Sequence, residues 1–372
     1  MKVLVAGDFC SRYRTANIIE GCYDEALGSV RKITENSDCS IVNLECPIIN
    51  GLSSPIIKQG PNLYGTEKMV DAIRFMGFDC VTLANNHFYD QGENGVHDTI
   101  AALKQHGVDY VGGGFNLNEA SKILYKEING ERLAIVNCCE HEFSIATEKT
   151  GGANPLNPVM QYYAIREAKV NADYVLVIVH GGHEHYQLPS PRMVETYRFF
   201  VDAGADAVVN HHQHCYSGYE VYNGKPIFYG IGNLYFDMET PVFDKPWNFG
   251  YLVMLDMSKS EVSYSYHPYK QCAEEPMITL LDQSSFDETL NSLNRTISDK
   301  EKLQEATNKY YHTEMIGVES FLNPYQKRIV RAMVKIGVLP TLFKKQWLLK
   351  MQNYIECESH RDKVEFYLNN KR

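Results

Sequence analysis

Six histidines stand in two clusters between residues 177 and 214, and each cluster follows an apolar run. VLVIVHGGHEHY contains His180, His183 and His185, and GADAVVNHHQHC contains His211, His212 and His214. Such β-branched runs predict buried strands, and open α/β sheets place ligand sites at the carboxyl ends of their strands. Imidazole is a preferred ligand of zinc and similar transition metals. The two clusters therefore predict a metalloenzyme.

Three further predicted strands also end in side chains that can bind metals. They are Asp8 after Lys2–Ala6, Glu45 after Ser40–Leu44, and Asn86 with His87 after Cys80–Ala84. One polar residue at a strand end is weak evidence, because such residues commonly form turns and helix caps. Five such ends on one face of a parallel sheet would converge on a single site, and this favours a functional interpretation.

The elements that position these residues alternate between strands and helices through the first 270 residues. Further strands are predicted at Leu133–Cys138, Tyr174–Val179 and Ala207–Asn210, and helices at Glu67–Met76, Gly95–His106, Met160–Lys169 and Met193–Ala203. This order predicts α/β units around a mainly parallel central sheet. The Asn223-Gly224 pair predicts a β-hairpin, and Gly250–Asp256 with Glu261–His267 predicts a second antiparallel pair.

Composition limits the classes of function. The 372 residues are 44% hydrophobic and 22% charged, with a net charge of −10, which is typical of a globular protein and argues against nucleic-acid binding. The first apolar run is too short for a signal peptide, and no apolar stretch approaches the length of a membrane span. The ten cysteines form no CxxC pair, so we expect reduced thiols in a cytoplasmic protein.

The chain changes character near residues 270–280, which predicts a domain at 1–275 and a helical extension at 276–372. Between Ser320 and Ile355 the charged residues are all basic: Lys327, Arg328, Arg331, Lys335, Lys344, Lys345 and Lys350. Without these seven charges the net charge of −10 becomes −17. The basic segment either docks on the protein's own acidic surface or contacts anionic lipid at the inner face of the membrane or a capsule-machinery partner.

Several motifs resemble those of the CapA family over about residues 1–240. In order, they read NLECPI, LANNHFYDQG, VIVHGGHEHY, GADAVVNHHQHC and KPIFYGIGNLYFD. That family is linked to bacterial capsule and poly-γ-glutamate synthesis and belongs to the calcineurin-like metallophosphoesterase superfamily. The resemblance implies a four-layer α/β/β/α sandwich with a site for one or two divalent ions of manganese, iron or zinc. The helical extension is not part of the resemblance.

The resemblance also implies a role for each matching residue. It implies metal ligation by Asp8, Glu45, Asn86, His180, His212 and His214. Glu45 takes the position of a bridging aspartate, and His87 that of the catalytic histidine beside the leaving group. Asp90 either orients His87 or caps a turn. One departure is Cys10, which stands where the superfamily has a histidine and either binds zinc or fills space.

Substrate contacts are expected from residues next to these ligands. Lys58, in the K-x-G-P element, either contacts an anionic substrate or is solvated, and Glu184 matches the family as an orienting or substrate-contacting residue. His183 is a further candidate, and His141 and Glu142 lie in a long loop that could reach the substrate.

The resemblance implies a hydrolase that cleaves a phosphoester, or an amide or ester of an anionic cell-surface polymer or its precursor. Its substrate would be the anionic polymer or a small phosphorylated or carboxylated molecule. The alternative is a non-catalytic capsule-assembly factor that retains the fold and binds polymer or partners.

Overall fold

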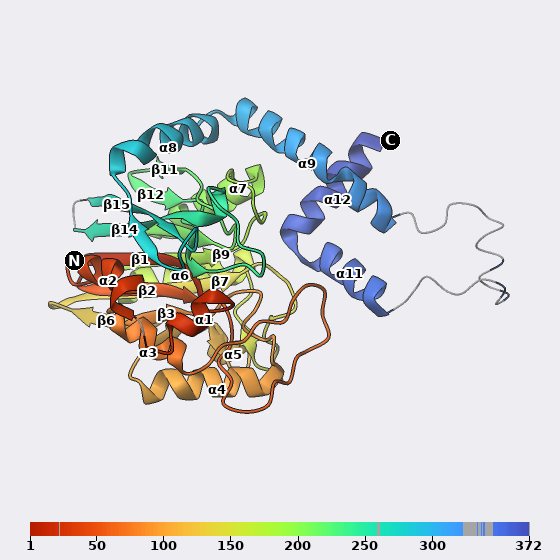
Figure 1. Ribbon diagram of the computed structural model, residues 1–372. Helices are drawn as coiled ribbons and strands as arrows, with labels where there is room; N and C mark the ends of the chain where they lie inside the picture. The colour runs from red at the N-terminus through yellow and green to blue at the C-terminus, as the bar shows by residue number, and fades with distance from the viewer. Residues whose placement is uncertain are drawn as a thin grey trace.

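Strand β1 (Lys2–Cys10) is buried from Val3 to its end and lies inside an eight-stranded sheet that stacks on a second sheet (Figure 1). The computed structural model describes residues 1–21, 23–258, 261–322 and 345–371, together with residues 333, 336 and 338. The metal-ligating residues predicted from the sequence all lie within these ranges.

The first sheet has the order β16-β15-β14-β1-β2-β3-β4, and β13 also pairs with β1. Its other strands are β2 (Cys39–Leu44), β3 (Cys80–Thr82), β4 (Asp109–Val111), β13 (Asn233–Phe236), β14 (Phe249–Met257), β15 (Val262–Gln271) and β16 (Ile278–Leu280). Strands β1 to β4 run parallel, whereas β14 to β16 add to the sheet in antiparallel fashion. The predicted antiparallel pair near residues 250–267 is thereby confirmed.

The second sheet has the order β11-β12-β10-β9-β7-β6. Its strands are β6 (Leu124–Ile128), β7 (Glu131–Cys139), β9 (Tyr174–His180), β10 (Ala207–His211), β11 (Tyr219–Tyr222) and β12 (Lys225–Phe228). The central strands are parallel, and the Asn223-Gly224 turn joins β11 and β12 as predicted. A separate two-stranded sheet pairs β5 (Gly113–Gly114) with β8 (Gly152–Ala153).

Side-chain alternation along the strands produces the layers. In β1, Val3 and Val5 face the core between the sheets, whereas Leu4 and Ala6 face the helices, because successive side chains of a strand point to opposite sides. The helices covering the first sheet are α2 (Tyr23–Thr34), α3 (Lys68–Phe75) and α4 (Gly92–Gln105), and those covering the second are α6 (Pro158–Asn171) and α7 (Pro191–Ala203). The predicted four-layer α/β/β/α sandwich is confirmed.

Residue patterning alone predicted one mainly parallel sheet, and that prediction is wrong. The two sheets contribute equally hydrophobic strands, so periodicity does not show which strands share hydrogen bonds. The short elements α1 (Arg14–Ile18), α5 (Leu117–Ala120) and the 3₁₀ turn Pro246–Asn248 lie in connections. Helices α6 and α7 each begin two residues before the predicted start, because Asn157 and Ser190 cap them and proline follows each cap.

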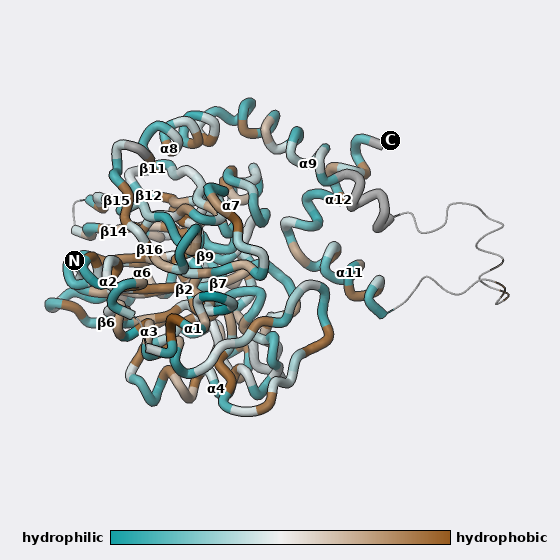
Figure 2. Tube along the Cα trace, viewed as in Figure 1, coloured by the Kyte–Doolittle hydropathy of each residue, from teal (hydrophilic) through white to brown (hydrophobic). Residues whose placement is uncertain are grey.

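The C-terminal extension is helical, as predicted. It contains α8 (Gln283–Ile297), α9 (Lys300–Leu322), α11 (Lys345–Glu356) and α12 (Glu358–Lys371). Figure 2 shows hydrophobic and hydrophilic residues interspersed along α9 and α11. Among the described helices, none is long and apolar enough to cross a membrane. Two residues of the predicted basic segment, Lys345 and Lys350, belong to α11. The other five lie outside the described residues: Lys327, Arg328, Arg331, Lys335 and Lys344.

Candidate metal centre

Asp8 lies inside β1 rather than after it, because the strand continues to Cys10. The register of β1 against β2 shifts between Ala6 and Asp8, and such a bulge redirects the side chains around it. Gly7 permits this shift, since a Cβ there would lie 1.9 Å from the carbonyl oxygen of Gly232. Asp8 accepts hydrogen bonds from Asn43 Nδ2 at 2.7 Å and from the backbone N–H of His212 at 3.2 Å.

The remaining predicted ligands come from strand ends of both sheets, not of one. Glu45 and Asn86 follow β2 and β3 of the first sheet, His180 ends β9 of the second sheet, and His212 and His214 follow β10. The carboxyl ends of these parallel strands meet at one edge of the sandwich. All six predicted ligands therefore lie close together, although their separate metal-binding roles remain predictions.

Two groups of potential ligands share Glu45. One group is Glu45 with His180 and His212, and the other is Glu45 with Asp8 and His214. Within each group, one ligand atom from every residue lies within 4.8 Å of the others. A carboxylate common to two adjacent groups has the position that a ligand bridging two cations requires.

Individual distances show how densely the donor atoms are packed. Glu45 Oε1 lies 3.7 Å from His180 Nε2 and 3.5 Å from His214 Nε2. His180 Nε2 is also 3.0 Å from Asn86 Oδ1 and 3.1 Å from His212 Nδ1. One imidazole N–H cannot satisfy all of these acceptors at once, whereas a cation among them can bind several.

The electrostatics of Glu45 also fit a cation. Both of its carboxylate oxygens are buried without a hydrogen-bond partner. Burial, reinforced by the carboxylate of Asp8, raises the pKa of Glu45 well above its usual value. Burial and the neighbouring His212 lower the pKa of His180, which keeps its imidazole neutral and able to bind a metal. This mixed nitrogen and oxygen donor set fits manganese, iron or zinc better than calcium.

Two of the histidines have an unusual backbone conformation. His212 has φ of 87° and His214 has φ of 53°, in the left-handed region that residues other than glycine rarely adopt. Such conformations cost on the order of 1–3 kcal/mol each and are found preferentially at functional sites. Both side chains point toward Glu45 as a result of this turn, so the strained backbone serves the geometry of the site.

His87 lies beside the centre with Asp90 and Lys58. His87 Nδ1 is 2.6 Å from Asp90 Oδ2, which also accepts the backbone N–H of Leu63. Asp90 therefore both orients His87 and fixes a loop. Burial and the ammonium of Lys58 lower the pKa of His87, against the opposing effect of Asp90. Lys58 itself forms a buried ion pair with Asp90, and this contact holds its ammonium against His87.

Cys10 lies in the hydrophobic core on the helix side of the first sheet. Its side chain is fully buried, and burial together with Cys46 raises the pKa of its thiol well above the usual value. Among the described residues, no cluster of metal-ligating side chains includes Cys10. Of the two interpretations of Cys10, the structure therefore supports the one in which it fills space.

Two cavities adjoin the centre. One of about 410 Å³ is lined by His87, Glu184, His185 and His214 together with Arg12 and Trp247. The other, of about 300 Å³, lies between His212 and residues of α9 and α12. Desolvation raises the pKa of Glu184, but His212 and His214 outweigh it and lower the value to about 2. Glu184 thus stays ionised at the junction of the two cavities.

His183 lines the cavity of about 300 Å³, but most of its side chain is covered by other residues. Its side chain is buried, and Nε2 lies 3.1 Å from the carbonyl oxygen of Ser359. The rings of Tyr310 and Tyr311 pack against it, each with a centroid distance of 5.3 Å. Burial lowers the pKa of His183 to about 3. His141, in the long loop after β7, pairs with Glu358 at 2.5 Å.

Several residues that support the ligands were not predicted. Asn43, the residue before the last of β2, contacts Asp8 and lies 3.3 Å from His180 Nδ1. Asn233 Oδ1 lies 2.9 Å from His214 Nδ1. The other ring nitrogen of His214, Nε2, faces Glu45. An asparagine inside a fully buried strand is a detectable signal, because a buried amide requires polar partners.

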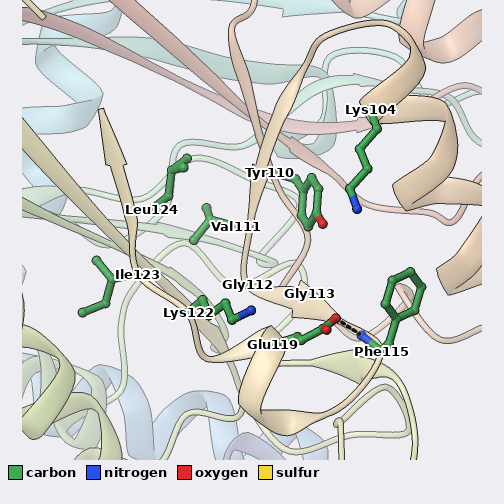
Figure 3. A pocket seen from close by; sticks show the side chains of 10 residues that line it. All are labelled: Lys104, Tyr110, Val111, Gly112, Gly113, Phe115, Glu119, Lys122, Ile123 and Leu124. Atoms are coloured by element: carbon green, nitrogen blue, oxygen red, sulfur yellow. Dashed lines mark hydrogen bonds between the residues drawn. The ribbon is translucent and has the colours of Figure 1, made fainter. Parts of the chain in front are cut away.

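A further cavity of about 320 Å³ lies elsewhere, at the edge formed by β4, α5 and the start of β6 (Figure 3). Lys104, Tyr110 and Lys122 line it, and Glu119 accepts the backbone N–H of Phe115 beside it. None of the predicted site residues lines this cavity. The candidate centre is therefore not in this hollow but at the strand ends.

Two curated relatives are similar to this chain over its first part. "Capsule biosynthesis protein CapA" of Bacillus anthracis is 36% identical over 222 residues, which is 58% of this chain and 54% of the relative. "PGA biosynthesis protein CapA" of Bacillus subtilis (strain 168) is 34% identical over 217 residues, or 58% of this chain and 57% of the relative. The chain thus spans little more than half the length of these relatives.

Solved structures are similar at a lower level. A hypothetical protein from Thermus thermophilus has a TM-score of 0.47 and 16% identity, covering 73% of this chain and 99% of that chain. A 5'-nucleotidase precursor from the same organism has a TM-score of 0.46 and 11% identity, covering 79% of this chain and 58% of that chain. Similarity this low adds nothing to the assignment of function.

The family match is more extensive. It covers residues 2–238, which include β1 to β13 and all of the predicted metal ligands, and the family is described as "Bacterial capsule synthesis protein PGA_cap". Because these residues make up more than half of the 372, the chain belongs to the bacterial capsule synthesis protein family PGA_cap.

Proposed function

We propose that this protein is a metal-dependent hydrolase in capsule or poly-γ-glutamate biosynthesis. Its substrate would carry a phosphoester, or an amide or ester bond of an anionic polymer or precursor. The observation that carries this proposal is Glu45, which belongs to both groups of potential ligands and has two buried oxygens without a hydrogen-bond partner. The names of the two CapA relatives support the biosynthetic context.

The proposed mechanism assigns binding and proton transfer to separate residues. Asp8, Glu45, Asn86, His180, His212 and His214 would hold the cations. Divalent cations in such a site generate a nucleophile from water and polarise the bond that is cleaved. The surrounding core excludes bulk water from Asp8 and Glu45, which strengthens every electrostatic interaction at the reacting centre.

His87 is the proposed proton donor to the leaving group. Its Nδ1 is engaged by Asp90, so Nε2 is the atom that remains for the substrate, and donation from Nε2 requires the imidazolium form of the ring. The ring lines the cavity of about 410 Å³ beside His214, where a leaving oxygen or nitrogen would lie. A positioned imidazole that transfers a proton in the transition state contributes about 10²–10⁴-fold to the rate.

The charge of Lys58 is already balanced by the buried carboxylate of Asp90, which weakens its attraction for an anionic substrate. Arg12 lines the same cavity as His87, and we propose it as the side chain that attracts the substrate's negative charge. Its guanidinium packs 4.9 Å from the centroid of the Tyr13 ring.

A non-catalytic assembly factor is the second candidate. Cys10 favours it, because a buried core thiol occupies the position where the superfamily has a histidine. Purified full-length protein, measured for metal content and for hydrolysis of bis-p-nitrophenyl phosphate, separates the two. Hydrolysis that requires added manganese, iron or zinc supports the enzyme. Bound metal without turnover of phosphoester or γ-glutamyl substrates supports the assembly factor.

A further inference from the structure

A third group of potential metal ligands shares no residue with the candidate centre, and two of its three members, Cys357 and His360, lie outside the family match. Glu142 belongs to the loop after β7, Cys357 joins α11 to α12, and His360 lies in the first turn of α12. One ligand atom from each residue lies within 4.8 Å of the others. Residues far apart in the sequence therefore converge on one small volume.

Hydrogen bonds on both sides hold this segment in place. Glu358 accepts the backbone N–H of His141 at 2.9 Å, and Ser359 Oγ donates to the carbonyl oxygen of Gly182 at 2.7 Å. These two residues stand between Cys357 and His360, so both flanking side chains are directed at the loop that carries Glu142. The Cys-x-x-His spacing places a thiol and an imidazole on the same side of the helix start.

The donor atoms in this group have no partner or only a long contact with one. His360 Nδ1 is buried without a hydrogen-bond partner, and Cys357 is 1% exposed. Cys357 Sγ has one long contact, 3.9 Å from Glu140 Oε2. Glu142 Oε2 accepts a weak hydrogen bond from Asn86 Nδ2 at 3.4 Å. An unpartnered buried imidazole nitrogen beside a thiol and a carboxylate is a set of groups suited to a cation.

We propose that Glu142, Cys357 and His360 bind a zinc ion. Thiolate, imidazole and carboxylate are the three ligand types that zinc uses in proteins, at about 2.0–2.3 Å, and the soft thiolate selects against magnesium and calcium. The two negative ligands would neutralise the ion's charge in a buried setting. The fourth position is left to a water molecule. This ion would fasten α12 to the loop that borders the candidate centre.

The proposal does not depend on the hydrolase activity, and cobalt substitution tests it. Full-length metal-free protein is titrated with Co²⁺, and near-ultraviolet absorption reports bonding between a thiolate and cobalt. The wild-type protein should show the thiolate band, Cys357→Ser should lose it, and Cys10→Ser should keep it. Cys10 is the matched control because its thiol is also buried but lies in the core next to the first sheet.

Three results would overturn the zinc site. They are a wild-type protein without a thiolate band, a band that survives Cys357→Ser, and a band that is lost in Cys10→Ser instead. If the Cys357→Ser variant does not fold, the His360→Gln variant tests the proposal instead. It retains the thiol, and it should weaken cobalt binding at the thiolate band by about tenfold or more. Unchanged cobalt affinity in His360→Gln would also overturn the proposal.

Discussion

The candidate metal centre and the C-terminal helices meet at the same face of the protein, but they are held by different kinds of interaction. Apart from Asp8, which lies inside β1, the predicted ligands of the centre lie at or just after the ends of fully buried strands. The helices contact this face through ion pairs and through the rings of Tyr310 and Tyr311. Arg192 of α7 bonds Glu140 at 2.7 Å and Asp362 of α12 at 2.9 Å, and His141 pairs with Glu358.

This contrast assigns the chemistry to the strand ends and the access to the site to the C-terminal helices. The strand ends fix the distances among Asp8, Glu45 and the histidines without help from the extension, and they lie within the family match. The helices form one wall of the cavity that reaches His212. We therefore expect substitutions in the strand ends to abolish function, whereas substitutions in the helices should alter what reaches the site.

The largest expected effect follows from Glu45→Gln. The change removes the shared ligand, so metal-dependent hydrolysis should fall to background. It should also stabilise the metal-free protein, because burial and Asp8 disfavour the charged carboxylate. Wild-type protein at a cation concentration 100 times Kd should gain about 2.7 kcal/mol, and the variant should gain far less.

Thermal unfolding with and without Mn²⁺ measures the two stability effects, and a hydrolysis assay measures the loss of activity. Readdition of cation after chelation should restore the melting temperature of the wild type only. A Glu45→Gln variant that responds to cation as strongly as the wild type would show that Glu45 is not a ligand.

His87→Ala should lower kcat by about 10²–10⁴-fold and leave the metal content unchanged. His87 contacts Asp90 and lines the cavity, but it is not in either group around Glu45. His97→Ala is the control, because His97 is an exposed histidine on α4. Metal lost together with activity in His87→Ala would instead make His87 a part of the cation site.

Much of the fold was predictable because its strands are short, apolar and bounded by turn residues. The strands that carry Glu45, His180 and His212 were each predicted within two residues of their observed bounds. Their division into two sheets was not predictable from periodicity, because a buried strand has the same pattern in either sheet. Only the family resemblance implied the sandwich.

Site residues that directly follow a strand could be predicted from the sequence. Residues whose surroundings depend on distant parts of the chain could not. The predicted ligands Glu45 and His180 each stand directly after an apolar run. Lys58 and His183 belong to the second kind: one is paired with Asp90, and the other is covered by Ser359 and two tyrosines. No local pattern reveals that residues so distant in the sequence will cover a histidine.

Arg192→Ala should loosen the C-terminal helices. Burial raises the pKa of Glu140, but Arg192 outweighs it and lowers the value to about 2, so Glu140 is ionised and depends on this partner. Breaking a buried pair from one side costs about 3–5 kcal/mol. Arg198→Ala, on the same helix, removes a more exposed pair with Glu220 and should cost about 0.2–1 kcal/mol.

Hydrogen exchange of α12 and the free energy of unfolding measure this difference. Faster exchange in α12 of Arg192→Ala, with the strand ends still protected, is the expected pattern. Equal effects of the two arginine substitutions would mean that the buried pair does not hold the helices.

Tyr310→Leu should have the smallest effect and the most specific one. Tyr310 stacks on Tyr186 with a centroid distance of 4.0 Å, and it lines the cavity that reaches His212. Loss of the stack should cost about 0.5–1.5 kcal/mol, because leucine keeps the apolar contact but not the ring. If the extension only shapes access, KM should rise while kcat stays constant. A fall in kcat at unchanged KM would show that the helices act on the chemistry itself, and the separation between the two regions would be wrong.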